Sequence, residues 1–344
     1  MFKILVVAPS WIGDAMLAQP LLVRLKQRHP DARIDLLAPP WTAALFRQMP
    51  EVHAVFANPF PHGELKLGAR YRLGKQLRDA RYDQAIILPN SFKSALIPFY
   101  ARIPLRTGFV GEMRYGLLND ARKLNKAELP LMVERFAQLA EAPGELIQRP
   151  LPQPTLSVGE EQRRKVLNKL GLIQTQQPIA IFCPGAEYGP AKRWPVSYFA
   201  ELAQQIHAQG YAVWLVGSAK DKSVGEEIVT LSQGVCRNLC GATDLADAIV
   251  LLSCADIVVS NDSGLMHLAA ALNRPMLALY GSSSPAFTPP LSARAQVLKL
   301  DLPCSPCFQR ECPLGHFNCM VQLTPSQIYQ HIPIKVIENE HETT

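Results

Sequence analysis

Residues 256–272 read Asp-Ile-Val-Val-Ser-Asn-Asp-Ser-Gly-Leu-Met-His-Leu-Ala-Ala-Ala-Leu, and this stretch decides the fold class. Its first part, 256–260, is apolar and rich in β-branched residues, which predicts a buried strand. A polar turn over 261–264 follows, and three alanines at 269–271 then allow a helix to approach a sheet closely. Any of the three polar residues before the glycine is suited to the N-cap of that helix.

The turn of this stretch, Asn261 to Gly264, also bears on function. A helix that begins at the carboxyl end of a strand presents free backbone N–H groups and the positive end of its dipole, which suits a phosphate group. A capped turn without any ligand explains the same residues. Both interpretations stay open on this stretch alone.

Length and composition fit a folded protein with two domains. The chain has 344 residues, of which 48% are hydrophobic and 19% are charged. The formal net charge of +6 favours an anionic ligand or an anionic membrane surface. The charge is too diffuse to indicate nucleic-acid binding by itself.

The first residues, Met-Phe-Lys-Ile-Leu-Val-Val, do not resemble a signal peptide, because the apolar run is short and Asp14 follows soon. No segment has the apolar length that a bilayer-spanning helix requires. We therefore expect a cytoplasmic protein, with peripheral membrane contact left open. The eight cysteines are then expected to be mostly reduced.

Strand patterns alternate with helix patterns along the chain, which predicts an α/β fold with parallel sheets. The expected strands are 3–8, 34–38, 52–56, 84–88, 179–183, 212–216, 256–260 and 276–280; the longer expected helices are 14–28, 65–80, 130–141, 160–170, 195–209 and 223–231. Three prolines in 148–154 predict a linker between two Rossmann-like domains that face a cleft. We assign 1–150 to the first domain, 151–325 to the second and 326–344 to a C-terminal helix and tail. Whether the last helix returns to the first domain is left open.

Two loops of the second half have the composition of a nucleotide site. Lys192 and Arg193 lie in a Gly- and Pro-rich loop just after a strand, where positive charge suits a departing diphosphate; a solvated basic loop is the alternative. Asp221 follows the next strand and could bind ribose hydroxyls, or cap a helix instead. Thr243 lies where another helix begins and could border the base.

In the first half, Asp14 follows the first strand and its loop. A carboxylate there would face the cleft and could accept a proton from an attacking hydroxyl; an N-cap role is the alternative. The glycines do not form G-x-G-x-x-G, so a dinucleotide cofactor has weak support.

These residues together resemble a known family. The matching segments are Ser10-Trp-Ile-Gly-Asp14, Leu88-Pro-Asn-Ser-Phe-Lys-Ser-Ala95, Arg106-Thr-Gly-Phe109 with Gly111-Glu-Met-Arg-Tyr-Gly116, Pro184-Gly-Ala-Glu187 with Ala191-Lys-Arg-Trp-Pro195, and Asn261-Asp-Ser-Gly-Leu-Met-His267. The chain resembles the ADP-heptose:lipopolysaccharide heptosyltransferases of glycosyltransferase family 9, and among them the type II enzymes. The resemblance implies a GT-B fold, an inverting mechanism, ADP-L-glycero-D-manno-heptose as donor, and the first heptose on Kdo2-lipid A as acceptor.

The resemblance also implies site residues. Asp14 matches the catalytic base, and Lys192 matches the lysine that holds the donor diphosphate and assists its departure. The implied donor-binding set is Gly185, Ala186, Lys192, Asp221, Thr243, Asp262, Ser263, Gly264 and His267; for His267 a structural role is the alternative. Asn90, Lys93, Arg106 and Arg114 would suit the acceptor. No cofactor is required if Lys192 and the helix dipole supply the positive charge.

A cysteine-rich segment near the end lies outside this resemblance. Cys304, Cys307, Cys312 and Cys319 begin with a C-x2-C spacing that zinc sites use, but no second C-x2-C follows. A structural zinc ion, a disulfide pair and reduced structural cysteines all stay open, although a cytoplasmic location disfavours the disulfide.

Other functions are weighed against the transferase. A nucleotide-sugar transferase with another donor or acceptor, such as the type I heptosyltransferases, would carry similar phosphate-binding residues. A nucleic-acid module is disfavoured, because only Arg310, Phe308 and Phe317 accompany the cysteines. The expected partners are ADP-heptose, the heptosyl-Kdo2-lipid A acceptor and the inner face of the inner membrane, with no nucleic acid.

Overall fold

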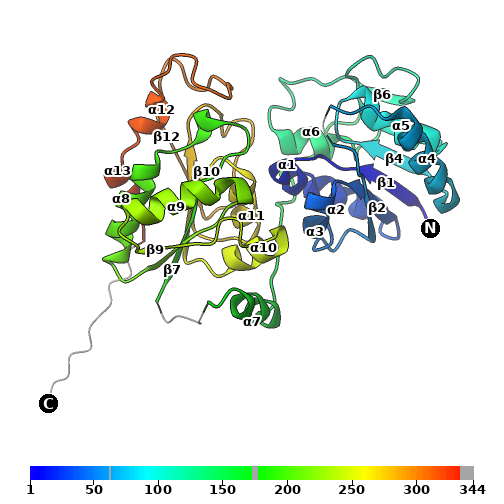
Figure 1. Ribbon diagram of the computed structural model, residues 1–344. Helices are drawn as coiled ribbons and strands as arrows, with labels where there is room; N and C mark the ends of the chain where they lie inside the picture. The colour runs from blue at the N-terminus through cyan, green and yellow to red at the C-terminus, as the bar shows by residue number, and fades with distance from the viewer. Residues whose placement is uncertain (62, 173–176, 334–344) are drawn as a thin grey trace.

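The computed structural model describes residues 1–61, 63–172 and 177–333. Two parallel sheets of six strands form two domains (Figure 1). Their strand orders are β3-β2-β1-β4-β5-β6 and β12-β11-β10-β7-β8-β9. The predicted α/β architecture with two Rossmann-like domains is confirmed.

The first domain is built around β1, which pairs with β2 and β4. Its strands are β1 Lys3–Val7, β2 Arg33–Ala38, β3 Ala54–Ala57, β4 Gln84–Ile87, β5 Leu105–Phe109 and β6 Asp120–Arg122; its helices are α1 Ile12–Leu17, α2 Gln19–Arg28, α3 Pro40–Phe46, α4 Leu67–Leu77, η1 Arg78–Ala80, α5 Phe92–Tyr100 and α6 Met132–Gln138. Helices cover the sheet, so the apolar run of β1 is buried except at its start.

The second domain is built around β10, which is buried along its whole length between β7 and β11. Its strands are β7 Ile179–Cys183, β8 Ala212–Leu215, β9 Cys236–Asn238, β10 Ile257–Asn261, β11 Met276–Tyr280 and β12 Ala295–Lys299; its helices are α7 Glu160–Lys169, η2 Pro190–Lys192, α8 Val196–His207, η3 Ala219–Asp221, α9 Lys222–Leu231, α10 Leu245–Ser253, α11 Gly264–Ala271, α12 Asn318–Val321 and α13 Pro325–Tyr329. Among the helices described, none is long and apolar enough to cross a membrane.

The structure corrects several expected elements. The helix expected over 14–28 is two helices, α1 and α2, that meet at Ala18, and Pro20 lies in the first turn of α2, where its missing N–H costs nothing. Strands β5, β6, β9 and β12 were not expected. The last helix, α13, packs on α8 and therefore stays with the second domain. The domain bounds at residues 150 and 325 stay predictions.

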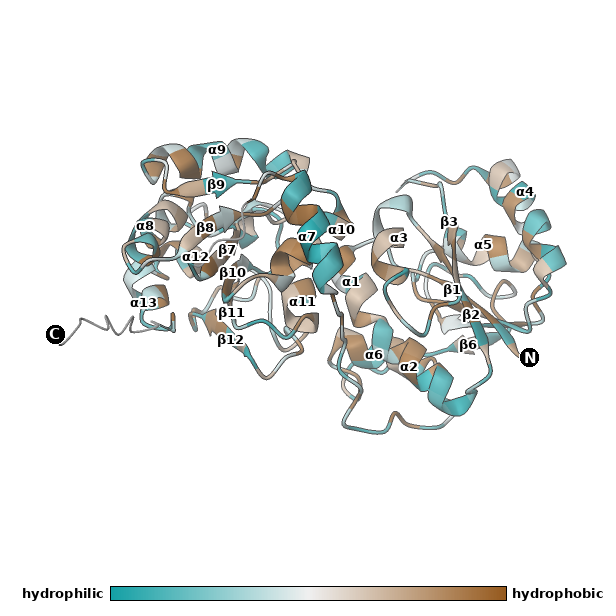
Figure 2. Cartoon of the chain, turned by 90° about the horizontal axis from the view of Figure 1, so that it is seen from below, coloured by the Kyte–Doolittle hydropathy of each residue, from teal (hydrophilic) through white to brown (hydrophobic). Residues whose placement is uncertain are grey.

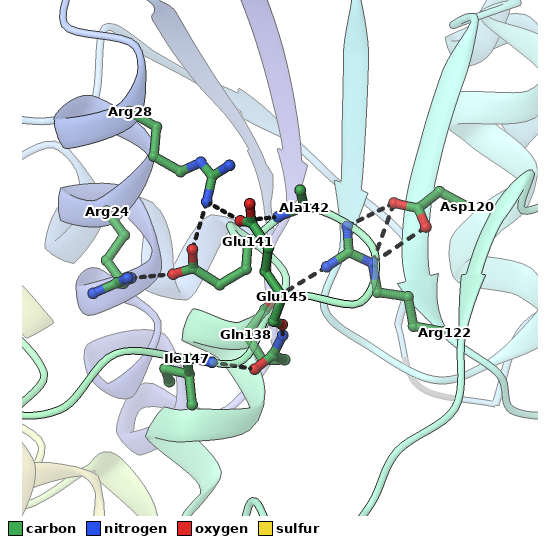
Figure 3. A network of polar contacts seen from close by, with 9 residues as sticks. All are labelled: Arg24, Arg28, Asp120, Arg122, Gln138, Glu141, Ala142, Glu145 and Ile147. Atoms are coloured by element: carbon green, nitrogen blue, oxygen red, sulfur yellow. Dashed lines mark hydrogen bonds and ion pairs between the residues drawn. The ribbon is translucent and has the colours of Figure 1, made fainter.

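The chain that leaves α6 is fixed to the first domain by an ionic network (Figure 3). The carboxylate of Glu141 is buried, and it accepts hydrogen bonds from Arg24 and, at 2.5 Å, from Arg28, both on α2. The Ile147 N–H donates to the side chain of Gln138 at 3.0 Å. Because a buried charge is costly without its partners, these bonds hold the approach to the linker in place.

The two domains touch through α1 and α11. A Cβ on Gly264 would lie 2.8 Å from Ile12, and a Cβ on Gly13 would lie 2.8 Å from the ring of His267. Side chains larger than glycine would push these helices apart. The first turns of α1 and α11 are therefore brought side by side, one from each domain.

Candidate active site

A cavity of about 1160 Å³ lies between the two domains and is lined by residues of both. The first domain contributes Trp11, Asp14 and Trp41. The second contributes residues at the carboxyl ends of its strands, which is where open α/β sheets bind ligands. Every residue of the implied donor-binding set lines this cavity: Gly185, Ala186, Lys192, Asp221, Thr243, Asp262, Ser263, Gly264 and His267.

Asp14 lies in the first turn of α1 and lines this cavity. The N-cap of α1 is Trp11, which makes no side-chain capping bond, so Asp14 is not the N-cap. Its surroundings are mostly protein, and this burial raises the pKa of Asp14 to about 6. Asp262 raises this pKa further, whereas Lys192 lowers it. A carboxylate with such a pKa is charged at neutral pH and is more basic than an ordinary aspartate.

Lys192 and Asp262 form an ion pair across from Asp14. The Lys192 Nζ lies 2.5 Å from the Asp262 Oδ2, and both side chains are largely buried. The Ser283 hydroxyl donates to the same carboxylate oxygen at 2.5 Å. The Lys192 ammonium also lies 5.1 Å from the centroid of the Tyr188 ring. The lysine is thus held in one position by a carboxylate and an aromatic ring.

The first turn of α11 lines the cavity with Ser263 and Gly264. Ser263 is the N-cap, but its side chain makes no capping bond. The backbone N–H groups of this turn are therefore available to an anion, and the helix dipole adds to their effect. This geometry fits the phosphate interpretation of the turn.

Asn261 has a positioning role that the sequence did not reveal. It is the last residue of β10 and is fully buried. Its Oδ1 accepts the Trp194 N–H at 3.0 Å, and its Nδ2 donates to the Pro184 carbonyl at 2.8 Å. It therefore ties both ends of the Lys192 loop to β10. A buried amide at the end of an apolar strand is the only sequence signal.

Asp221 both caps a helical turn and faces the cavity. Its Oδ2 accepts the Ser218 N–H at 2.9 Å and the Ser218 hydroxyl at 2.7 Å. A Cβ on Gly185 would lie 2.5 Å from this carboxylate, so the glycine is needed for the two loops to meet. Asp221 is also the N-cap of α9 but makes no side-chain capping bond there, so its carboxylate closes the η3 turn and faces the cavity.

His267 lies at the domain contact against Gly13 and is buried. Burial lowers the pKa of His267 to about 4, with Lys192 lowering it further and Asp262 opposing the change. The imidazole is therefore neutral over the physiological range. Its packing between α11 and α1 agrees with the structural alternative.

The residues implied for the acceptor, Asn90, Lys93, Arg106 and Arg114, do not line the cavity. Arg114 is almost completely buried and donates to the carbonyls of Pro89 and Phe109 at 2.6 Å each. Arg106 donates to the carbonyls of Leu117 and Ile103 in the same way. Because their donors are occupied by the backbone, the geometry does not support acceptor contacts by these two arginines.

The cysteine-rich segment shows no metal geometry. In the part of the chain that the structure describes, no three His, Cys, Asp or Glu side chains are placed to hold a metal ion. Cys304, Cys307, Cys312 and Cys319 are free thiols. Neither zinc nor a disulfide has support from this geometry, and the choice among the three interpretations stays a prediction.

The same segment packs on the donor side of the cavity, which was not expected. The Ala191 N–H donates to the carbonyl of Arg310 at 3.0 Å, and the Tyr188 hydroxyl donates to the carbonyl of Phe308 at 2.7 Å. The Phe308 N–H donates to the Ser282 carbonyl at 2.6 Å, and its side chain lines the cavity. The segment therefore supports the loops that carry Lys192 and Ser283.

The chain is similar to known transferases over nearly its whole length. The profile of glycosyltransferase family 9 (heptosyltransferase) matches residues 70–318. Lipopolysaccharide heptosyltransferase 2 of Escherichia coli strain K12 is 47% identical, over 98% of this chain and 99% of that protein. Lipopolysaccharide heptosyltransferase 2 of Salmonella typhimurium is 48% identical, over 96% and 97% respectively.

A solved structure has the same fold. The structure of the ADP-heptose lipopolysaccharide heptosyltransferase II of Escherichia coli superimposes with a TM-score of 0.87 at 46% identity. The match covers 96% of this chain and 97% of that one. By sequence and by fold, the chain belongs to glycosyltransferase family 9, the heptosyltransferases.

Proposed function

We propose that this enzyme transfers L-glycero-D-manno-heptose from ADP-heptose to the first heptose of the lipopolysaccharide inner core, with inversion at the anomeric carbon. One observation carries the proposal: Asp14 and the Lys192–Asp262 pair line one cavity from opposite domains. A base on one side and a cation on the other is what a displacement at an anomeric carbon requires. The names of the relatives support ADP-heptose as the donor and lipopolysaccharide as the acceptor.

In the proposed reaction, Asp14 takes the proton of an acceptor hydroxyl. The oxygen forms a bond to the anomeric carbon as the bond from that carbon to the diphosphate breaks, and ADP departs with the bonding electrons. One displacement inverts the configuration, so no covalent enzyme intermediate forms. The pKa of about 6 leaves Asp14 unprotonated at neutral pH and able to accept the proton.

The departing diphosphate gains negative charge, which Lys192 and the first turn of α11 stabilise. Lys192 is held by Asp262 at 2.5 Å and is therefore preorganised before the donor arrives. When the lysine shares its protons with the diphosphate, the Asp262 carboxylate becomes available to hydroxyls of the donor sugar. These groups supply the charge that the reaction needs, so we propose no cofactor.

The acceptor in full is proposed to be heptosyl-Kdo2-lipid A, which the enzyme meets at the inner face of the inner membrane. This places the protein in the cytoplasm with peripheral contact to the bilayer. The identity of 47% and 48% to relatives named heptosyltransferase 2 supports this choice over the type I alternative.

The test is transfer by the purified protein, followed by mass spectrometry of the acceptor. ADP-heptose with heptosyl-Kdo2-lipid A should yield a product with one more heptose, whereas Kdo2-lipid A without heptose should remain unchanged. Transfer to Kdo2-lipid A alone would favour the type I alternative. Transfer from UDP- or GDP-linked sugars but not from ADP-heptose would refute the proposed donor.

A further inference from the structure

Three segments at the carboxyl ends of the strands of the first sheet expose apolar side chains. All strands of this sheet are parallel, so the chain segments that follow β3, β4 and β5 begin at the carboxyl ends of the strands. The segment from β1 to Asp14 begins at the same end of the sheet. We call their exposed side chains the rim surface: Leu65 (45% exposed), Leu67 (48%), Phe92 (39%), Met113 (82%) and Tyr115 (68%). Apolar side chains this exposed cost free energy in water unless a partner covers them.

Buried arginine side chains hold two of these segments together. Arg70 is 3% exposed and donates to the carbonyl of Leu65 at 2.7 Å and to that of Lys93 at 3.3 Å. This guanidinium joins the segment before α4 to the start of α5. The rim surface is therefore built by the fold, and its side chains are not on independent loops.

The third segment is tied to the start of α5 in a similar way. The Phe92 N–H donates to a carboxylate oxygen of Glu112 at 2.7 Å. Arg114 joins the same two loops through the carbonyls of Pro89 and Phe109. Met113 and Tyr115 flank this buried arginine and point away from the core, since both are exposed.

Positive charge surrounds the rim surface. Residues 64–115 contain ten lysines and arginines against four acidic residues, an excess equal to the +6 of the whole chain. Lys93 follows Phe92, and on the exposed face of α4 Arg72 and Lys75 continue the pattern. None of these three cations forms an ion pair with any residue that the structure describes. Figure 2 shows α4, with hydrophilic and hydrophobic stretches side by side, on the side of the first domain remote from the second.

We propose that the rim surface docks this enzyme on an anionic lipid bilayer. Exposed apolar side chains flanked by lysine and arginine are the composition of an interfacial membrane contact, in which the apolar groups enter the headgroup region and the cations face acidic headgroups. The inference rests on the proposed function, since a lipid-borne acceptor requires a transferase that works at a membrane. Docking through the rim surface would turn the carboxyl ends of the first sheet's strands, and with them Asp14, toward the lipid-borne acceptor.

The test is flotation of the full-length protein with vesicles. Vesicles of phosphatidylcholine with about a third of phosphatidylglycerol should carry the protein, and pure phosphatidylcholine vesicles should carry far less. The paired change Met113→Asn and Tyr115→Ser should weaken binding to the anionic vesicles about tenfold or more. Asparagine is chosen because residue 113 has φ of 52°, a conformation that it tolerates.

Matched control variants distinguish binding through the rim surface from nonspecific binding through other exposed apolar residues. Leu146 and Leu314 are 70% and 61% exposed but lie elsewhere, so Leu146→Ser with Leu314→Ser should leave flotation unchanged. Arg72→Ala with Lys75→Ala should reduce the preference for anionic vesicles, whereas Lys165→Ala with Lys222→Ala on the second domain should not. Failure of the parent protein to bind anionic vesicles, or equal binding by the Met113→Asn, Tyr115→Ser variant, would overturn the proposal.

A soluble acceptor distinguishes this proposal from the proposed function. Heptose transfer to a delipidated inner-core oligosaccharide should be the same in the parent and in the Met113→Asn, Tyr115→Ser variant, because neither residue lines the cavity. A parent protein that floats with vesicles but transfers no heptose would refute the proposed function alone. A parent protein that transfers heptose but does not float with vesicles would refute only the proposal that the rim surface docks on a membrane.

Discussion

The two domains share one architecture, six parallel strands covered by helices, yet they supply different chemical groups to the cavity. The first offers Asp14, whose burial raises its pKa to about 6. The second offers Lys192, already paired with Asp262, and the free N–H groups of α11. The same fold can thus build a base or an anion site, depending on the side chains that follow the carboxyl ends of its strands.

The largest effect is expected from Asp14→Asn on the first domain. Asparagine keeps the shape but cannot accept a proton, so turnover should fall by roughly two to four orders of magnitude. ADP binding, measured by calorimetry on the same preparation, should change little, because the nucleotide contacts proposed here lie on the second domain. Near-normal turnover in Asp14→Asn would contradict the proposal that the first domain supplies the catalytic base.

Lys192→Ala is the matching change on the second domain. It removes the positive charge that the departing diphosphate needs, so turnover should fall on the order of a hundredfold or more. ADP affinity should fall less than turnover, since charge on the diphosphate grows as the bond breaks. Steady-state transfer and ADP titration measure the two quantities, and an unchanged turnover would contradict the assignment.

Ser283→Ala, also on the second domain, should lower turnover less than Lys192→Ala. The hydroxyl holds the Asp262 carboxylate at 2.5 Å, so its loss should loosen the carboxylate and lower kcat about three- to tenfold. The neighbouring Ser282 is buried, and its hydroxyl has no hydrogen-bond partner among the residues that the structure describes, which makes Ser282→Ala a matched control with little expected change. Equal loss in both variants would indicate general disturbance of the loop.

The stability of Asp14→Asn should differ from that of the parent in a pH-dependent way. Because the folded pKa of Asp14 lies above its ordinary value of 3.8, the charged form is disfavoured by folding and stability is lost as pH rises through about 6. The neutral variant should therefore be more stable at pH 8 by about 3 kcal/mol, and about equally stable near pH 4. Denaturant unfolding at the two pH values checks this; a variant less stable at pH 8 would contradict the burial argument.

Much of the second domain could be predicted from the sequence. The strand expected over 256–260 is β10, Ile257–Asn261, and the helix after the turn is α11. This succeeded because a central parallel strand is buried on both faces, and the consecutive residues Ile257, Val258 and Val259 show it. The edge strands β6 and β9 have three residues each, with polar residues among them, and their pairing comes from neighbours that sequence patterns do not show.

The structure brings the residues expected on the donor side into one cavity, but not those expected on the acceptor side. Glycine, lysine and small polar residues at strand ends point to a phosphate because the topology alone brings them together. Arg114 was expected at the acceptor, but it lies buried with its donors on the carbonyls of Pro89 and Phe109. Backbone carbonyls carry no sequence signal, so an arginine that binds them cannot be told from one that binds a ligand.

The central claim is that the first domain supplies the base, and the pH dependence of kcat/KM for the parent enzyme tests it most directly. The account predicts that kcat/KM falls with a slope of one below about pH 6, as Asp14 takes up a proton. His267 does not titrate in this range, because its pKa is lowered to about 4. Affinity for ADP-heptose, measured by calorimetry without acceptor, should stay level over the same range, because its diphosphate is esterified at both ends and does not titrate there. A profile of kcat/KM that is flat from about pH 5 to 7, or that follows ADP-heptose binding, would contradict the account.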